Sequence, residues 1–325
     1  MKKNNIDALL TGDFLRMCVA HFLLFAGLFM LLPWLPMALK QHMQIPLSQG
    51  AWLYAAFVAG MFIVGPFHAH LGDVHRRKHL FLFPAIGMAA AGVGYLYATD
   101  WMQCCLLALV QGACFALAMV GDLTVAIDIT HSSRRTGGNL VYAWLGRMGW
   151  MVGACVGSWL FLHVELRQLI MVAGGTVLAG CYFGMRVYVP FRAPIGVPVA
   201  TLDRFLLPRA WVPAIGVVLL SMAVGRLLPL LLGGDYCPLI GLGLLAVAVI
   251  PLVRLFVRLS HHCQRGTANA SCYQAMDMGL LLGLALSYRH FDAVTLHRTA
   301  LQWVIVALLF LVFAVYPYYR YHRLR

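Results

Sequence analysis

Four ionisable side chains stand inside long apolar runs of the sequence, where a charge is costly: they are His21, Asp122, Arg147 and Asp277. Ionisable groups at such positions commonly mark solute or proton pathways. A carboxylate can take up and release a proton, an arginine can hold an anion, and a histidine titrates near neutral pH. We therefore treat these four residues as candidates for a solute or proton site.

Helical spacing predicts how these groups lie. Asp122 falls about two turns from the end of one predicted helix and Arg147 about two and a half turns into the next, at about 3.6 residues per turn. We therefore predict an Asp122–Arg147 contact or a shared polar cavity, with a purely structural ion pair as the alternative. Asp277 falls in the first turn of its predicted helix, where the helix dipole favours a carboxylate. For His21 the alternative to a proton carrier is a neutral, hydrogen-bonded histidine.

Other chemistry is excluded by spacing. Ser-His-Asp, Walker and His-x-x-Glu-His patterns do not occur, so neither an enzyme nor an ATP-driven pump is expected. The nine cysteines have neither disulfide nor metal-ligand spacing. We expect no cofactor and no metal.

Composition assigns the chain to the lipid bilayer. It has 325 residues, of which 62% are hydrophobic and 11% are charged, whereas a soluble domain carries about a quarter charged residues. The formal charge of +13 is assigned to membrane topology and anionic headgroups, not to nucleic acid. A polytopic membrane protein is therefore predicted, most simply a monomer.

The apolar runs predict an all-α protein of about ten transmembrane helices, because they are continuous and do not alternate as barrel strands do. The predicted helices are 14–38, 50–71, 79–98, 102–127, 138–162, 168–188, 211–232, 237–258, 273–291 and 299–317. The stretch 189–210, rich in proline and arginine, separates a six-helix half (1–188) from a four-helix half (211–325) and is predicted to be a cytoplasmic linker.

The distribution of Lys and Arg fixes the orientation. With both termini in the cytoplasm, seventeen of these residues lie on the inner side, four on the outer side and three within helices. The positive-inside rule then predicts a multi-pass protein of the inner (plasma) membrane with both termini cytoplasmic.

Two stretches, 135–153 and 265–283, match at a constant offset of 130 residues. The aligned pairs are Arg135/Arg265, Asn139/Asn269, Arg147/Asp277, Met148/Met278, Gly149/Gly279 and Gly153/Gly283. Both copies enter the membrane from the same side, as in transporters built from parallel repeats. The asparagines are expected to cap their helices. The glycines, extended by Gly157, are expected to form faces for close helix packing.

The hairpin between the second and third predicted helices carries Gly72 and Asp73 ahead of three consecutive cations, Arg76, Arg77 and Lys78. The loop 69–78 resembles the Gly-x-Leu-Ala-Asp-Arg-x-Gly-Arg-Arg/Lys motif of the major facilitator superfamily (MFS), and within it the Bacteroidetes-type drug and metabolite permeases. The stretches 10–14, 33–36, 111–112, 134–135 and 265–269 also look like the family, so the resemblance covers essentially the whole chain.

The resemblance implies a secondary transporter with a cytoplasmic gate in this hairpin. The gate residues would be Gly72, Asp73, Arg76, Arg77 and Lys78, with Asp73 approaching the start of a later helix near Tyr273 to Asp277. The chain has Ala108 where the family has an Arg implicated in proton coupling, and Ala154 where its antiporter motif has Pro. The repeat register predicts that the family's eighth and ninth helices are lacking, which gives a contracted second half.

These features predict a secondary active transporter of a small organic solute, most simply a proton-coupled exporter working by alternating access. The alternative is a degenerate, non-transporting relative with a sensor or interaction role, which the eroded motifs and the lacking helix pair favour.

Overall fold

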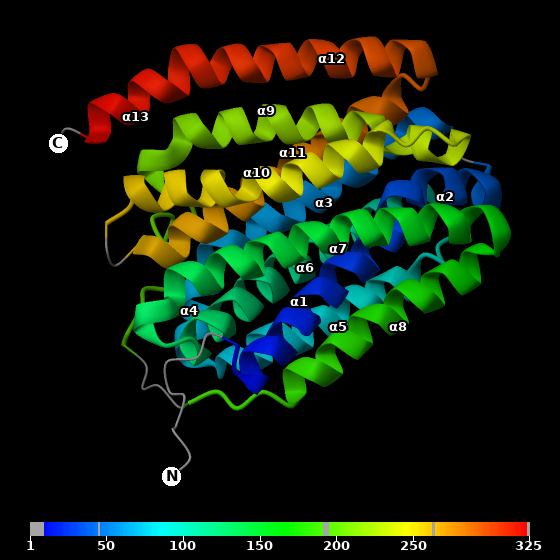
Figure 1. Ribbon diagram of the computed structural model, residues 1–325. Coiled ribbons are helices and arrows are strands. Elements are labelled where there is room, and N and C mark those ends of the chain that lie inside the picture. The colour runs from blue at the N-terminus through cyan, green and yellow to red at the C-terminus, as the bar shows by residue number, and fades with distance from the viewer. Residues whose placement is uncertain (1–9, 45, 191–194, 262–263, 324–325) are drawn as a thin grey trace.

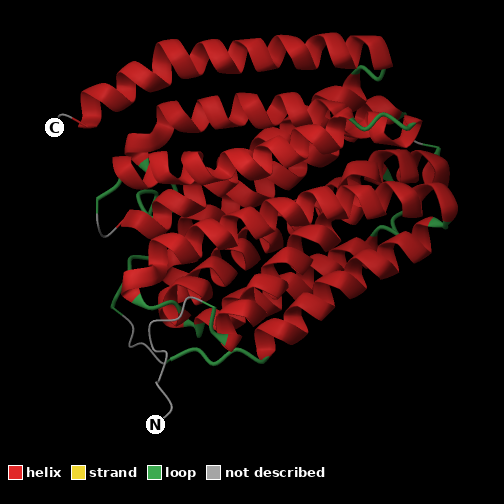
Figure 2. Ribbon diagram, in the orientation of Figure 1, coloured by secondary structure: helices red, strands yellow, loops and turns green. Residues whose placement is uncertain are grey.

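The computed structural model describes residues 10–44, 46–190, 195–261 and 264–323. The described chain is helical without strands and forms one bundle of roughly parallel and antiparallel helices (Figures 1 and 2). Residues 191–194 of the predicted linker and the extreme termini lie outside the described ranges.

Within each half the helices follow one another through short connections, and the linker joins α8 to α9. In the first half they are α1 (Gly12–Leu31), α2 (Leu35–Met43), α3 (Gly50–Val64), α4 (His68–Val74), α5 (Arg77–Gly94), α6 (Trp101–Ile129), α7 (Arg135–His163) and α8 (Leu166–Met185). In the second half they are α9 (Trp211–Leu227), α10 (Cys237–Leu259), α11 (Arg265–Arg289), α12 (Ala293–Phe310) and α13 (Tyr316–Arg323).

Prolines and capping residues set several of these boundaries. Short 3-10 turns that contain Pro33, Pro66 and Pro229 follow α1, α3 and α9, because proline lacks the N–H that would continue the helix ladder. Asp292 caps α12 by accepting hydrogen bonds from the hydroxyl and the backbone N–H of Thr295. The same two bonds lower the pKa of the Asp292 carboxyl.

Eight helical stretches of the described chain are long and apolar enough to cross a membrane. The prediction of an all-helical membrane protein is confirmed, whereas the count of ten is not, because α5 and α11 are less apolar. α5 begins with Arg77 and Lys78, and α11 carries Asn269 and Asp277. Both nevertheless pack against neighbouring helices, α5 against α6 and α8 and α11 against α9 and α3.

The packing repeats between the two halves. α1 packs on α7 and α8 as α9 packs on α11 and α12, and α3 packs on α11 as α10 packs on α7. α10 therefore takes the position equivalent to α3, the second helix of its half. The lack of the eighth and ninth helices that the repeat register predicts would make α10 the tenth helix of a twelve-helix fold. Packing corrects this to the eighth, so the helices lacking from the described second half are the equivalents of α5 and α6.

Glycines let the paired helices approach closely. A Cβ added at Gly153 would lie 2.9 Å from the Cα atom of Ala26 on α1, and one added at Gly279 would lie 3.0 Å from that of Val218 on α9. Cβ atoms added at Gly149 and Gly157 would also meet the backbone of α1, and one added at Gly283 would meet the backbone of α9. The repeated glycines thus lie where α7 crosses α1 and where α11 crosses α9.

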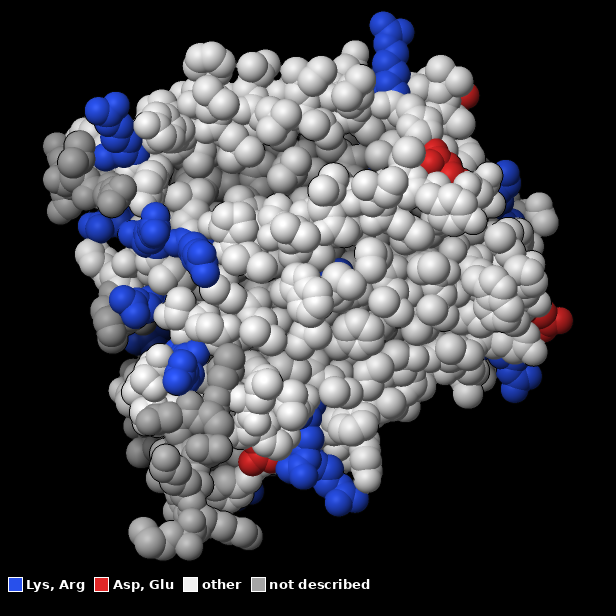
Figure 3. All heavy atoms as spheres, in the orientation of Figure 1, with Lys and Arg blue, Asp and Glu red and all other residues white. Residues whose placement is uncertain are grey.

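Lys and Arg gather at one end of the bundle, where α4 and α13 lie, and are sparser at the end where α2 lies (Figure 3). We call these the basic end and the opposite end. α7 and α11 both begin at the basic end and run in the same direction (Figure 1), as a parallel repeat requires.

Candidate functional site

An ion pair between the two halves lies buried in the bundle. Arg147 Nη1 on α7 donates to Asp277 Oδ1 on α11 at 2.8 Å, with side-chain exposures of 0% and 2%. The guanidinium carbon stands 3.8 Å from the ring centre of Trp150 and 4.8 Å from that of Phe25. The aromatic faces help to hold the cation in place of water.

A second polar pair lies beside it. His21 Nδ1 on α1 is 2.7 Å from Asp122 Oδ2 on α6, and both side chains are fully buried. The imidazole stacks on Tyr142, with ring centres 3.9 Å apart, and meets the edge of Phe25 at 4.8 Å. Because Phe25 contacts both His21 and Arg147, the two pairs form one central cluster on α1, α6, α7 and α11.

The structure brings together all four candidates from the sequence but pairs them differently. The predicted direct Asp122–Arg147 contact is replaced by His21–Asp122 and Arg147–Asp277. Asp277 also lies twelve residues inside α11, which starts at Arg265, so the first-turn interpretation of this carboxylate is wrong. For the same reason, Asn139 and Asn269 lie inside α7 and α11 and do not cap them.

A cavity of about 1070 Å³ opens at the basic end between the halves. It is lined by α4, α5, α6 and α7 from the first half, by α10 and α11 from the second, and by the linker. Asn139 and Asn269, one turn inside their helices, are among its lining residues. The cavity therefore runs between the two copies of the repeat.

Tyr273 separates this cavity from the central cluster. Its side chain is fully buried one turn beyond Asn269 on α11. The hydroxyl donates to the backbone carbonyl of Asn139 at 3.3 Å, and the ring centre is 5.2 Å from the Arg147 guanidinium. Tyr273 thus touches the cavity wall on one side and the ion pair on the other.

The predicted gate hairpin holds the linker. Both carboxylate oxygens of Asp73 accept backbone hydrogen bonds, from Ile195 at 2.8 Å and from Gly196 and Val197 at 2.9 Å. In this conformation, whose cavity opens at the basic end, Asp73 is bound by the linker, and its approach to α11 stays a prediction for a conformation closed at that end. The partner is the linker, whose Gly196 adopts a positive φ of 76° that suits glycine and lets successive N–H groups converge on one anion.

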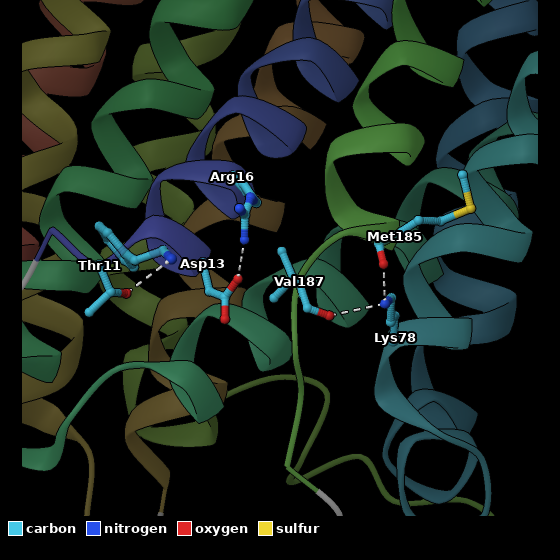
Figure 4. Close-up of polar contacts among 7 residues, drawn as sticks. Thr11, Asp13, Arg16, Lys78, Met185 and Val187 are labelled. Carbon is cyan, nitrogen blue, oxygen red and sulfur yellow. Dashed lines mark hydrogen bonds and ion pairs between the residues drawn. The ribbon is translucent and has the colours of Figure 1, made fainter.

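Arg77 and Lys78 of the hairpin have separate partners, and Gly72 lines the cavity together with Arg77. Arg77 pairs with Asp128 near the end of α6. Lys78 donates to the carbonyl of Met185 at the end of α8 and to that of Val187 at 3.0 Å (Figure 4). Arg76 is exposed. The hairpin thus ties α4 and α5 to α6, α8 and the linker, all within the first half or at its boundary.

The opposite end of the bundle is closed between the halves. Tyr288 on α11 donates its hydroxyl hydrogen to the carbonyl of Pro33 at 2.5 Å and stacks on Tyr54 of α3, with ring centres 6.0 Å apart. Tyr54 in turn donates to the carbonyl of Leu32 at 2.9 Å. The structure is thus open at the basic end and closed at the other.

Sequence reasoning missed the roles that aromatic residues have in this site, namely Phe25, Tyr142, Trp150, Tyr273 and Tyr288. The available signal was spacing: Tyr273 lies four residues before Asp277 and Tyr288 eleven after it, on one helix face. Among the described residues no group of three or more His, Cys, Asp or Glu side chains is placed to hold a metal ion.

Comparisons with known proteins agree on one architecture. The Major Facilitator Superfamily model matches residues 17–319, and no match was found among curated proteins. The nucleoside transporter NupG matches with a TM-score of 0.61 at 11% identity, covering 93% of this chain and 99% of that one. A NupG point mutant gives 0.63 at 9%, covering 92% and 99%.

A third solved structure comes from work on substrate recognition in proton-dependent oligopeptide transporters. It has a TM-score of 0.63 at 10% identity and covers 96% of this chain and 99% of that one. At such low identities these structures show a shared fold.

Proposed function

Because the chain belongs to the Major Facilitator Superfamily, we propose that it is a secondary transporter that moves a small organic solute across the inner membrane by alternating access. The observation that carries this proposal is the cavity between the halves, open at the basic end and closed at the other by Tyr288 on Pro33. Rocking of the two halves would exchange these ends.

The orientation follows from charge. The basic end faces the cytoplasm, as the positive-inside rule requires, so the linker and the gate hairpin lie on the cytoplasmic side. The structure then corresponds to an inward-facing state. We propose export as the direction of transport, because the open cavity would admit its solute from the cytoplasm.

Proton coupling is assigned to the central cluster. His21 and Asp122 can share or release a proton, and Asp277 is held by Arg147 in the same cluster. A change of protonation alters the cost of burying these charges and would bias one conformation over the other. Because Ala108 stands where the family has its arginine, coupling in this chain would have to rest on these other groups.

Labelling with a membrane-impermeant thiol reagent tests alternating access without a known substrate. Thr124→Cys places a thiol in the cavity wall. Leu284→Cys places one on the buried α11 face shared with Asp277 and Tyr288. In oriented vesicles we expect the first to react from the basic side and the second, more slowly, from the opposite side. The parent chain, with its native cysteines, gives the background.

The second candidate is a non-transporting relative, favoured by the lack of counterparts to α5 and α6 in the described second half. It predicts that the Leu284→Cys thiol never reacts from the opposite side while the Thr124→Cys thiol reacts from the basic side. A positive labelling result is followed by solute uptake and efflux in proteoliposomes with an imposed pH gradient.

A further inference from the structure

Three pairs of repeat-related residues follow one another from the basic end inward. They are Arg135/Arg265, Asn139/Asn269 and Arg147/Asp277. The first two pairs line the cavity, and the third lies beyond Tyr273. A solute entering between α7 and α11 therefore meets two cations first and two amides next, before it reaches the buried ion pair.

Arginine dominates the charged lining of the cavity. Its arginines are Arg77, Arg135, Arg204, Arg254, Arg258 and Arg265, and its aspartates are Asp73, Asp128 and Asp203. Two of these acids are already engaged, Asp73 by three linker N–H groups and Asp128 by Arg77. The cavity therefore carries an excess of positive charge.

This excess differs from the ordinary positive-inside signal. Cations that only set topology face headgroups, whereas these six line an aqueous recess between the halves. A recess lined by one sign of charge, with apolar walls, focuses the field and concentrates ions of the opposite sign. Arg135 and Arg265 stand on the two helices that the repeat relates.

A buried amide on the inner wall of the cavity lacks a hydrogen-bond partner. Asn269 is fully buried, and neither its amide oxygen nor its amide nitrogen has a hydrogen-bond partner among the described residues. Buried amides without partners are costly. The nitrogen can donate two hydrogen bonds, which suits a carboxylate or phosphate oxygen.

We propose that the cavity selects a negatively charged organic solute, bearing a carboxylate or phosphate group, which enters between Arg135 and Arg265 and is held by Asn139 and Asn269. The claim that this anion is the transported solute rests on the proposed function. The claim that the cavity prefers anions rests only on the charge of its lining and on the unpartnered amide of Asn269.

Two thiol reagents of similar size and opposite charge test the selection. In the Thr124→Cys variant we would compare the rate of sulfonatoethyl methanethiosulfonate, an anion, with that of trimethylammonioethyl methanethiosulfonate, a cation. Each rate is divided by the rate on a small free thiol. The normalised ratio is expected to favour the anion by about tenfold and to fall as salt is added. Effects on the cysteine's own thiolate fraction cancel in this ratio.

Charge variants of the same reporter locate the selection. Arg135→Gln with Arg265→Gln should lower the ratio several-fold. Arg134→Gln, at the exposed neighbouring arginine that does not line the cavity, should leave it unchanged. The proposal is overturned if the normalised anion-to-cation ratio is one or less. It is also overturned if the Arg135→Gln and Arg265→Gln double variant and Arg134→Gln change that ratio equally. Because the rates need no transport, failure of the Leu284→Cys labelling with an intact ratio would refute alternating access and leave the anion site standing.

Discussion

Arg147 and Asp277 occupy equivalent positions in the two copies of the repeat, and they bind each other across the interface of the two halves. One copy supplies the cation and the other the anion, so the pair forms only when the halves come together. Neither charge reaches solvent. An isolated charge at this depth would be strongly unfavourable. Each of the two side chains can be charged there because the other supplies the opposite charge.

Asp277→Asn is therefore expected to destabilise the folded protein, because it leaves the Arg147 charge buried without a counter-charge. Removing one partner of a buried pair costs about 3–5 kcal/mol. The change is measured as a fall in the thermal unfolding midpoint of the purified protein in detergent.

The matched control exchanges the charges. Arg147→Asp with Asp277→Arg restores one cation and one anion at the same positions, and it should recover part of the lost stability. Arg147→Met with Asp277→Leu should also be milder than either single change. Additive losses in these double variants would show that the two side chains do not act as a pair.

Hydropathy located most of the membrane helices but misplaced the start of α11. The first two turns, from Arg265 to Cys272, are polar or small, yet 268–272 is buried. A helix enclosed by other helices need not be apolar, because its neighbours and not lipid surround it. A predicted start at residue 273 places Asp277 in a first turn, where the helix dipole is expected to favour a carboxylate, whereas α11 starts at Arg265.

The repeat marked residues of the site without predicting their partners, because the contact predicted for Arg147 is with Asp122. The constant offset aligned Arg147 with Asp277 and brought the glycine faces of α7 and α11 into register, and both features bear on the packing of the structure. The sequence could not predict the hydrogen-bond partners of His21 and Asp73. These partners depend on how deep α1 and α6 lie relative to each other and on the path of the linker. No repeating pattern in the local sequence predicts either one.

Asp73→Asn is expected to release the linker from the hairpin. The two carboxylate oxygens now accept three hydrogen bonds from the N–H groups of Ile195, Gly196 and Val197. An amide offers only one oxygen for these bonds, and it has no negative charge to strengthen them. Amide hydrogen exchange at 195–197 should speed up several-fold, and transport should fall without a loss of protein from the membrane. Asp203→Asn removes a nearby cavity carboxylate that accepts none of these bonds, and it should leave the exchange unchanged.

Gly153→Val is expected to push α7 away from α1. The added atoms would overlap the backbone of Ala26, and overpacking of this kind typically costs about 1–3 kcal/mol. Gly175→Val on α8 is the matched control, because nothing lies within 4 Å of a Cβ added there. Equal unfolding midpoints for the two variants would contradict close packing at Gly153.

His21→Gln is expected to uncouple transport from the pH gradient, because it removes the titratable partner of Asp122 and keeps a polar side chain. Accumulation driven by an imposed gradient should fall, whereas exchange of solute across vesicles without a gradient should persist. His79→Gln, at an exposed histidine near the start of α5, should preserve both. Full gradient-driven accumulation in the His21→Gln protein would exclude His21 from coupling.

Tyr288→Phe is expected to loosen the closed end of the bundle. It removes the hydroxyl that donates to the Pro33 carbonyl between the halves and keeps a ring that can stack on Tyr54. A hydrogen bond of this kind contributes about 0.5–1.5 kcal/mol, which would shift the populations of the two conformations by about two- to tenfold.

In the Tyr288→Phe background, the Leu284→Cys thiol should react faster from the opposite side and the Thr124→Cys thiol more slowly from the basic side. Tyr54→Phe is the matched control, because the Tyr54 hydroxyl donates to Leu32 within its own half. The hydrogen bond of the Tyr54 hydroxyl is expected in both the open and the closed arrangement of the halves. Its removal should therefore destabilise both equally and change neither labelling rate. A Tyr288→Phe protein in which both thiols react as in the parent background would show that the Tyr288–Pro33 contact does not hold this end closed.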